Sequence, residues 1–385
     1  MKVKFKDFLP ILFFSLIPTL LIWLPFYLRL KTVWTIPISQ NGMATIVANY
    51  DGPLFLVVAK TFYDPAAITQ NFSFPLPVSY YPAHFPLFPA MIKLFSLITG
   101  FPYAMLTVTL LSSFLALYFF NKFIRDYTEK NNSLWLTFLF AIFPARWLIV
   151  RSVGSAEPMF LASTIASIYY FKKEKYLKAG IWGIMAQLTK SAGIILFVSY
   201  LAAIIFPKLS KAATQPFGKW IKSLELKKIF PILLIPLSLL GLFIFYKTNV
   251  GDFLAYFHSG DNIHLFFPPF QIFNYSQPWV GTFWLEEVIF VYLFGILGVL
   301  TLAKNKDVIF WFTAIFFIST IFVSHRDIIR YSLPIVPFLI AAFSEALIKK
   351  EFKIAIGLLI IPIYLFSLAY ISQNVMPISD WSPFL

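Results

Sequence analysis

Long apolar runs separated by short polar connections dominate the chain. About 20 consecutive apolar residues suffice for a helix to cross the hydrocarbon core of a bilayer. About eleven runs approach that length, and each predicts a spanning helix; they cover Phe8–Leu30, Pro102–Asn121, Leu134–Val150, Ala156–Phe171, Ala179–Leu188, Ala192–Phe206, Ile229–Lys247, Trp284–Ala303, Val308–Val323, Tyr331–Leu347 and Ile354–Ile371. The pattern therefore predicts an all-α polytopic membrane protein with a single domain over residues 1–385.

Two of these runs, Ala179–Leu188 and Ala192–Phe206, are short for a full crossing. They flank a polar stretch that contains Lys190. We expect a hairpin or a pair of half-length helices with Lys190 at the turn. A polar turn at membrane depth must be buried in protein or line a cavity.

Lysine clusters between the runs predict the orientation in the membrane. With a cytoplasmic N-terminus, every cluster falls on the cytoplasmic side, as the positive-inside rule requires; the clusters are Lys2–Lys6, Lys122–Lys130, Lys172–Lys178, Lys208–Lys228, Lys304–Lys306 and Lys349–Lys353. This assignment requires that Phe85–Thr99 does not cross. We expect it to lie in the outer interface, kinked by Pro86 and Pro89. Residues 31–101 and 248–281 then form two large outer loops, in the plasma membrane or the ER membrane.

Composition supports this assignment. Only 12% of residues are charged, against about 25% in soluble domains, and mean hydropathy is +0.78. The net charge of +14 fits lysines at one face of a bilayer better than a nucleic-acid partner. The chain has no cysteine, which excludes disulfides, thiolate nucleophiles and cysteine metal ligands.

Arginine and histidine are distributed differently from lysine. Five of the six arginines and all four histidines lie on or near the predicted outer side. Because the planar guanidinium captures phosphate with two hydrogen bonds, we expect a phosphate to be held there. Arg29 and Arg146 are better interpreted as interface anchors.

The first outer loop carries two acids. Asp51 follows the first span and is well placed to accept a proton from a hydroxyl at the membrane surface. Alternatively, Asp51 caps a helix that begins at Pro53. Asp64 precedes a proline, so it is a turn residue or a contact for substrate.

Further candidates lie far along the sequence. Glu157 stands at the outer mouth of a span, where an acid either opens a helix or serves the chemistry. Arg326 and Arg330 are four residues apart and would share a helical face. With Tyr331 they could bind a phosphate, which we prefer for Arg330, or they could be anchors at the membrane interface. His84 and the other histidines could join outer acids around a divalent cation, but no H-x-x-H or H-x-x-x-H pair occurs, so no metal ligand is assigned.

Five segments, in order along the chain, resemble the PIG-V family (GPI mannosyltransferase 2), whose members are polytopic glycosyltransferases of the GT-C fold. The segments are Tyr50-Asp51-Gly52 with Phe85–Pro89, Ser155–Phe160, Leu188–Gly193, Gly251–Tyr256 and Arg330–Pro334. Tyr50 stands where the family has tryptophan, and Lys190 where it has arginine.

The resemblance implies transfer of a hexose, typically mannose, from a polyprenyl-phosphate sugar on the non-cytoplasmic side. The acceptor would be a glycolipid, glycan or protein. The resemblance gives the role of general base to Asp51, with inversion at the anomeric carbon. Arg330 with Lys190 or Arg326 would stabilise the departing phosphate, and Glu157 would orient the acceptor or a cation. A transporter or lipid flippase is the alternative, but it predicts an inverted repeat that we do not find.

Overall fold

The computed structural model describes residues 5–72, 76–209, 216, 226–259, 265–274, 276 and 285–385. Asp261 and His264 of the second predicted outer loop lie outside the described residues, as does most of the lysine-rich segment Lys208–Lys228.

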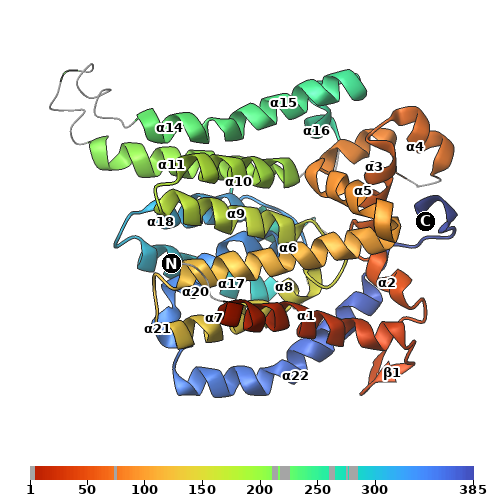
Figure 1. Ribbon diagram of the computed structural model, residues 1–385, viewed down its shortest axis with the longest axis horizontal. Coiled ribbons are helices and arrows are strands. Elements are labelled where there is room, and N and C mark those ends of the chain that lie inside the picture. The colour runs from red at the N-terminus through yellow and green to blue at the C-terminus, as the bar shows by residue number, and fades with distance from the viewer. Residues whose placement is uncertain are drawn as a thin grey trace.

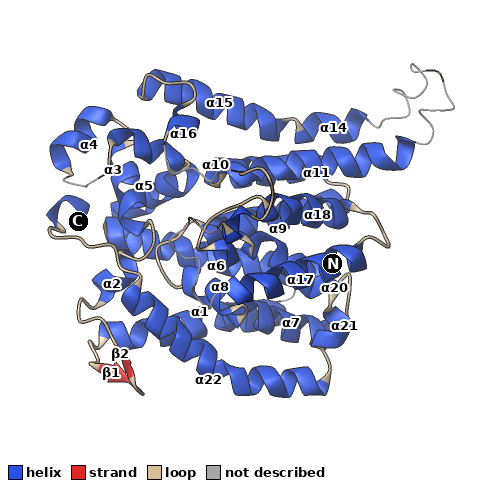
Figure 2. Cartoon of the chain, turned by 180° about the vertical axis from the view of Figure 1, so that it is seen from behind, coloured by secondary structure: helices blue, strands red, loops and turns tan. Residues whose placement is uncertain are grey.

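The described chain is mostly helical (Figures 1 and 2). The α-helices are α1 (Phe5–Tyr27), α2 (Met43–Val47), α3 (Gly52–Thr61), α4 (Pro65–Asn71), α5 (Leu87–Thr99), α6 (Phe101–Ile124), α7 (Lys130–Ile142), α8 (Ala145–Val150), α9 (Glu157–Lys172), α10 (Tyr176–Thr189), α11 (Ile194–Ile205), α14 (Leu226–Ile232), α15 (Leu234–Asn249), α16 (Ala255–His258), α17 (Leu285–Leu302), α18 (Val308–Ile321), α19 (Ile328–Tyr331), α20 (Val336–Ala342), α21 (Ser344–Leu347) and α22 (Lys350–Gln373). Short 3₁₀ turns are η1 (Val78–Ala83), η2 (Ser191–Gly193), η3 (Phe206–Lys208), η4 (Gln271–Phe273), η5 (Leu333–Ile335) and η6 (Ser382–Phe384). One two-stranded hairpin pairs β1 (Thr32–Val33) with β2 (Ile36–Pro37).

Six helical segments are long and apolar enough to cross a membrane by length and composition. They are Phe8–Tyr27, Phe101–Ile124, Ser191–Lys208, Lys227–Asn249, Leu285–Leu302 and Lys350–Gln373. Each coincides with one of the predicted spans. The all-helical, polytopic membrane class predicted from the sequence is confirmed.

Three predicted spans differ in detail. The run Leu134–Val150 is broken, because α7 ends at Ile142 and Pro144 cannot continue its hydrogen-bond ladder before α8 begins. The run Tyr331–Leu347 is likewise divided among η5, α20 and α21. The second half-length span is longer than expected, because η2, α11 and η3 together form an 18-residue helix.

The helix in the first outer loop also begins differently from our expectation. Pro86 is the N-cap of α5 and Pro89 lies in its first turn, so these prolines start the helix rather than kink it. Gly100, with φ of 75°, is the C-cap that ends α5. Leu97 and Ile98 are exposed, which suits a helix that touches lipid.

The helices pack side by side with their ends gathered at two poles (Figure 1). At one pole, the lysine-rich connections meet: Lys173 pairs with Asp126, and Lys172 lies 3.7 Å from Asp307. At the other pole, α2 to α5 of the first loop lie beside the C-terminal residues, and Lys60 donates to the Pro383 carbonyl at 2.7 Å. The predicted separation of lysine-rich and loop-rich ends is therefore present in the fold.

Between the poles, α6 packs against α1, α5, α7 and α9, while α10 packs against α9 and α15. Gly180 of α10 permits the close approach of α14, because a Cβ there would lie 2.2 Å from the carbonyl oxygen of Pro231 in that helix. These contacts bring the start of α9 and the end of α10 beside the first loop, at the loop-rich pole.

Candidate active site

A cavity of about 860 Å³ opens at the loop-rich pole. Seven of the eight predicted site residues line it: Asp51, His84, Glu157, Lys190, Arg326, Arg330 and Tyr331. They come from the start of α3, the turn before α5, the start of α9, the end of α10 and the segment around α19. Of the described residues, Asp64 is the predicted site residue that does not line this cavity.

Glu157 is the buried anion of the site. It begins α9, and its carboxylate is only 4% exposed. Its Oε1 accepts from Lys190 Nζ at 2.5 Å and from Arg330 Nε at 2.7 Å, while Oε2 accepts from the Ser155 hydroxyl. A buried carboxylate needs such partners, because desolvation without them is costly. These contacts fix the positions of both cations.

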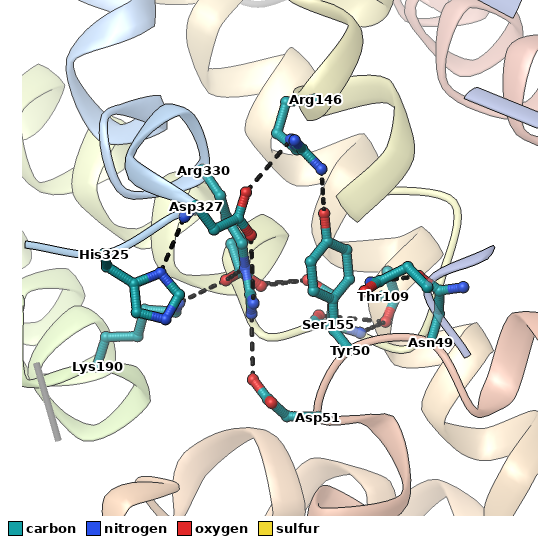
Figure 3. Close-up of polar contacts among 12 residues, drawn as sticks. Asn49, Tyr50, Asp51, Thr109, Arg146, Ser155, Lys190, His325, Asp327 and Arg330 are labelled. Atoms are coloured by element: carbon teal, nitrogen blue, oxygen red, sulfur yellow. Dashed lines mark hydrogen bonds and ion pairs between the residues drawn. The ribbon is translucent and has the colours of Figure 1, made fainter. Parts of the chain in front are cut away.

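Arg330 connects three carboxylates (Figure 3). Its side chain is 9% exposed. Besides Glu157, it reaches Asp51 Oδ2 at 3.3 Å through Nη2 and lies 3.9 Å from Asp327 through Nη1. Its guanidinium carbon also sits 4.2 Å from the centre of the Tyr50 ring, a cation–π distance.

Asp51 is the accessible acid of the cavity. It occupies the N-cap position of α3, yet its side chain makes no capping hydrogen bond. Its carboxylate is 33% exposed, and its contact with Arg330 is long at 3.3 Å. The alternative role as a helix cap is therefore wrong for its side chain.

Asp64 shows the contrast, because its Oδ1 accepts from the amides of Ala66 and Ala67 at the start of α4. This is the usual contact of an N-cap residue. Two acids in the same loop therefore have different surroundings, one in the cavity and one at a helix end.

Lys190 lies at the turn between α10 and α11, as predicted. Its extended backbone ends α10, and its side chain is 27% exposed. Ser191, the next residue, accepts from the Tyr256 hydroxyl at 2.9 Å. The turn is tight, because a Cβ on Gly193 would lie 2.4 Å from Gln187 Cα. The polar turn thus lines a cavity, as its predicted depth required.

Arg326 and His84 also line the cavity. Arg326 is exposed and precedes α19, so the expected shared helical face with Arg330 is not formed. The His84 ring packs edge-on against Phe55 at 5.0 Å, and its carbonyl accepts from the Tyr63 hydroxyl. Tyr331 contacts the His325 ring at 4.9 Å.

A polar layer at the back of the cavity, where Tyr50 and Asp327 line it, was not predicted from the sequence. Arg146 donates to the Tyr50 hydroxyl at 3.0 Å and lies 3.5 Å from Asp327 (Figure 3). Burial, and then the charge of Asp327, raises the pKa of Tyr50 well above its ordinary value, so the hydroxyl stays protonated. Burial also raises the pKa of Asp327, while Arg146 and Arg330 oppose that shift. No short motif around Arg146 announced this role.

Apolar side chains form the cavity wall between α11 and α18, including Ile194, Ile195, Ile315, Phe316 and Val323. This wall begins next to Lys190, so cations and hydrocarbon adjoin one another.

As for metal binding, no three His, Cys, Asp or Glu residues of the described chain are grouped to hold an ion. The Arg330 guanidinium itself bridges the Asp51 and Glu157 carboxylates.

No protein-family model matches the chain, and no curated protein matches its sequence significantly. Solved structures do match its fold. The structure of ArnT from Cupriavidus metallidurans bound to undecaprenyl phosphate superposes with a TM-score of 0.58 at 13% identity, over 90% of this chain and 62% of ArnT. The archaeal oligosaccharyltransferase AglB from Archaeoglobus fulgidus, in complex with an inhibitory peptide and a dolichol-phosphate, gives 0.51 at 15% identity, over 96% of this chain and 57% of AglB.

The chain shares the fold of these two proteins. The polytopic helical bundle expected from the sequence is thus confirmed at the level of the fold, and it is the folded backbone, rather than sequence identity, that carries the match. The chain spans about three fifths of the length of these two proteins.

Proposed function

We propose that this protein transfers a hexose from a polyprenyl-phosphate sugar to a lipid-linked, glycan or protein acceptor. One observation carries the proposal. Asp51, Glu157, Lys190 and Arg330, separated by up to 279 positions, meet in one cavity beside an apolar wall. A base, a pair of cations and a hydrocarbon surface are what this reaction requires.

Asp51 is the general base in this proposal. A base must be accessible to the acceptor hydroxyl and must have an oxygen free to take its proton. Asp51 is one third exposed with one long ionic contact, whereas Glu157 is buried and engaged at both oxygens. Glu157 therefore serves to hold the two cations.

Lys190 and Arg330 receive the donor phosphate. As the glycosidic bond to phosphate breaks, negative charge accumulates on the phosphate oxygens, and preorganised cations stabilise that charge. Both cations are already oriented by Glu157, so little reorganisation is needed when the donor binds. Attack by the acceptor oxygen from the Asp51 side, opposite the departing phosphate, would invert the anomeric carbon.

The isoprenoid chain of the donor lies along the apolar wall of α11 and α18. The two structural neighbours support a lipid phosphate as ligand, since their structures hold undecaprenyl phosphate and dolichol-phosphate. The resemblance to the PIG-V family favours mannose as the sugar. The lysine-rich pole faces the cytoplasm in this proposal, and the cavity faces the outer or lumenal side.

The test uses purified protein in lipid nanodiscs with polyprenyl-phosphate mannose and a panel of glycolipid and peptide acceptors. We expect a new glycosidic bond of inverted configuration, identified by mass spectrometry and NMR. The same protein is also placed in lipid vesicles. Movement of the donor lipid to the opposite leaflet of these vesicles, with no new bond formed, would instead establish a transporter.

A further inference from the structure

Arg146 lies directly behind the cavity rather than in it. Its side chain is 12% exposed, and Arg146 is not one of the described residues that line the cavity. It stands near the start of α8, just after the break at Pro144. Its guanidinium stacks 3.9 Å from the centre of the Tyr370 ring. The interface-anchor role that its sequence position indicated is therefore wrong.

One arm of Arg146 controls Tyr50. Nη1 donates to the Tyr50 hydroxyl at 3.0 Å. The ring of the same tyrosine lies under the guanidinium of Arg330. Tyr50 also has a positive φ of 49°, a conformation that is uncommon for a residue with a large side chain. Because Tyr50 directly precedes Asp51, the backbone conformation of Tyr50 determines where the Asp51 side chain is placed.

The second arm reaches Asp327. Nε lies 3.5 Å from Asp327 Oδ1, while the other oxygen of the same carboxylate lies 3.9 Å from Arg330 Nη1. Asp327 is therefore shared between the two arginines. Two separate routes, through Tyr50 and through Asp327, connect Arg146 to Arg330 (Figure 3).

We propose that Arg146 is a positioning residue that sets Arg330 and Asp51 for the transfer reaction without touching either substrate. This inference rests on the proposed function for its readout. The Arg146 guanidinium makes three contacts at once. Its face stacks on the Tyr370 ring, and its two edges form the hydrogen bond to Tyr50 and the ion pair with Asp327. A lysine ammonium keeps the charge but cannot supply this planar set of contacts.

The experiment compares Arg146→Lys and Tyr50→Phe with wild type, and uses Arg29→Lys as the matched control. Arg29 is the exposed arginine at the end of the first span. Binding of undecaprenyl phosphate is measured by native mass spectrometry, transfer by kcat and KM for the donor, and folding by Tm. Misplacement of reacting groups by about 1 Å can cost on the order of 100-fold, so we expect Arg146→Lys to lower kcat/KM roughly 10- to 100-fold.

We expect Tyr50→Phe to produce a smaller loss, because the ring under Arg330 remains. Each change alone should weaken the binding of undecaprenyl phosphate. In a protein that already carries Arg330→Gln, neither change should weaken that binding further. Wild-type kinetics in Arg146→Lys, or equal loss of binding with and without Arg330, would overturn the inference. Failure of the wild-type protein to bind undecaprenyl phosphate would instead refute the proposed function.

Discussion

Replacing Asp51 by asparagine should slow sugar transfer but strengthen binding of the donor phosphate. Asparagine has nearly the same shape as aspartate but carries no charge and cannot accept the proton. Transfer should therefore fall by about 10²- to 10⁴-fold, the usual contribution of a general base. Binding of the donor phosphate should become tighter, because Asp51 and the phosphate compete for Arg330 Nη2.

The size of the second effect follows from the contact. At 3.3 Å, two unit charges in a medium close to water attract by about 1 kcal/mol. We take this aqueous value as the lower bound: Asp51 is one third exposed, which admits solvent screening, while Arg330 is 9% exposed. One kcal/mol corresponds to about five-fold in a dissociation constant. Glu157 and Asp327 remain in contact with Arg330, so its position is retained.

The assay measures undecaprenyl-phosphate affinity and sugar transfer on the same preparations of wild type, Asp51→Asn and Asp64→Asn. Asp64 is the matched control, since it is an acid of the same loop that lies outside the lining of the described cavity. Near-normal transfer by Asp51→Asn would remove Asp51 from the role of base. Unchanged or weaker phosphate binding would refute the competition for Arg330.

Three further changes test other parts of the site. Glu157→Gln leaves Arg330 and Lys190 without their shared anion, so transfer should be lost and stability should fall by about 3–5 kcal/mol, seen as a lower Tm. Asp64→Ala removes two capping hydrogen bonds; it should cost about 1 kcal/mol in denaturant unfolding and leave kcat unchanged. Gly193→Ala should displace the Lys190 turn and raise donor KM, whereas Gly241→Ala, where a Cβ meets nothing within 4 Å, should behave as wild type.

Much of the fold was determined locally. Apolar length alone located the membrane helices, because a crossing segment must satisfy its own backbone hydrogen bonds. Lysine position separated the two poles, and Gly100 ended α5 because glycine readily adopts a positive φ. Local sequence was less able to foresee the break at Pro144, where a proline inside a long apolar run was counted as part of one span.

Residue chemistry also selected most of the cavity. An acid after the first span, an acid at a helix start and a lysine between two apolar helices were recognisable because each is expensive in a membrane unless partnered. Only the tertiary structure supplied those partners: Glu157 is 33 positions from Lys190 and 173 from Arg330. Residues so far apart in the sequence cannot be recognised as contacts from their spacing alone.

The distinction between similar residues was likewise decided by the fold. Asp51 and Asp64 both precede helices in one loop, yet one faces Arg330 and the other caps α4. Arg146 resembled an anchor in sequence but lies against Tyr50 and Asp327. Sequence determined which charged groups the chain must shelter from lipid, and packing of distant helices decided which of them meet, since pairing depends on distances that exist only in the folded chain.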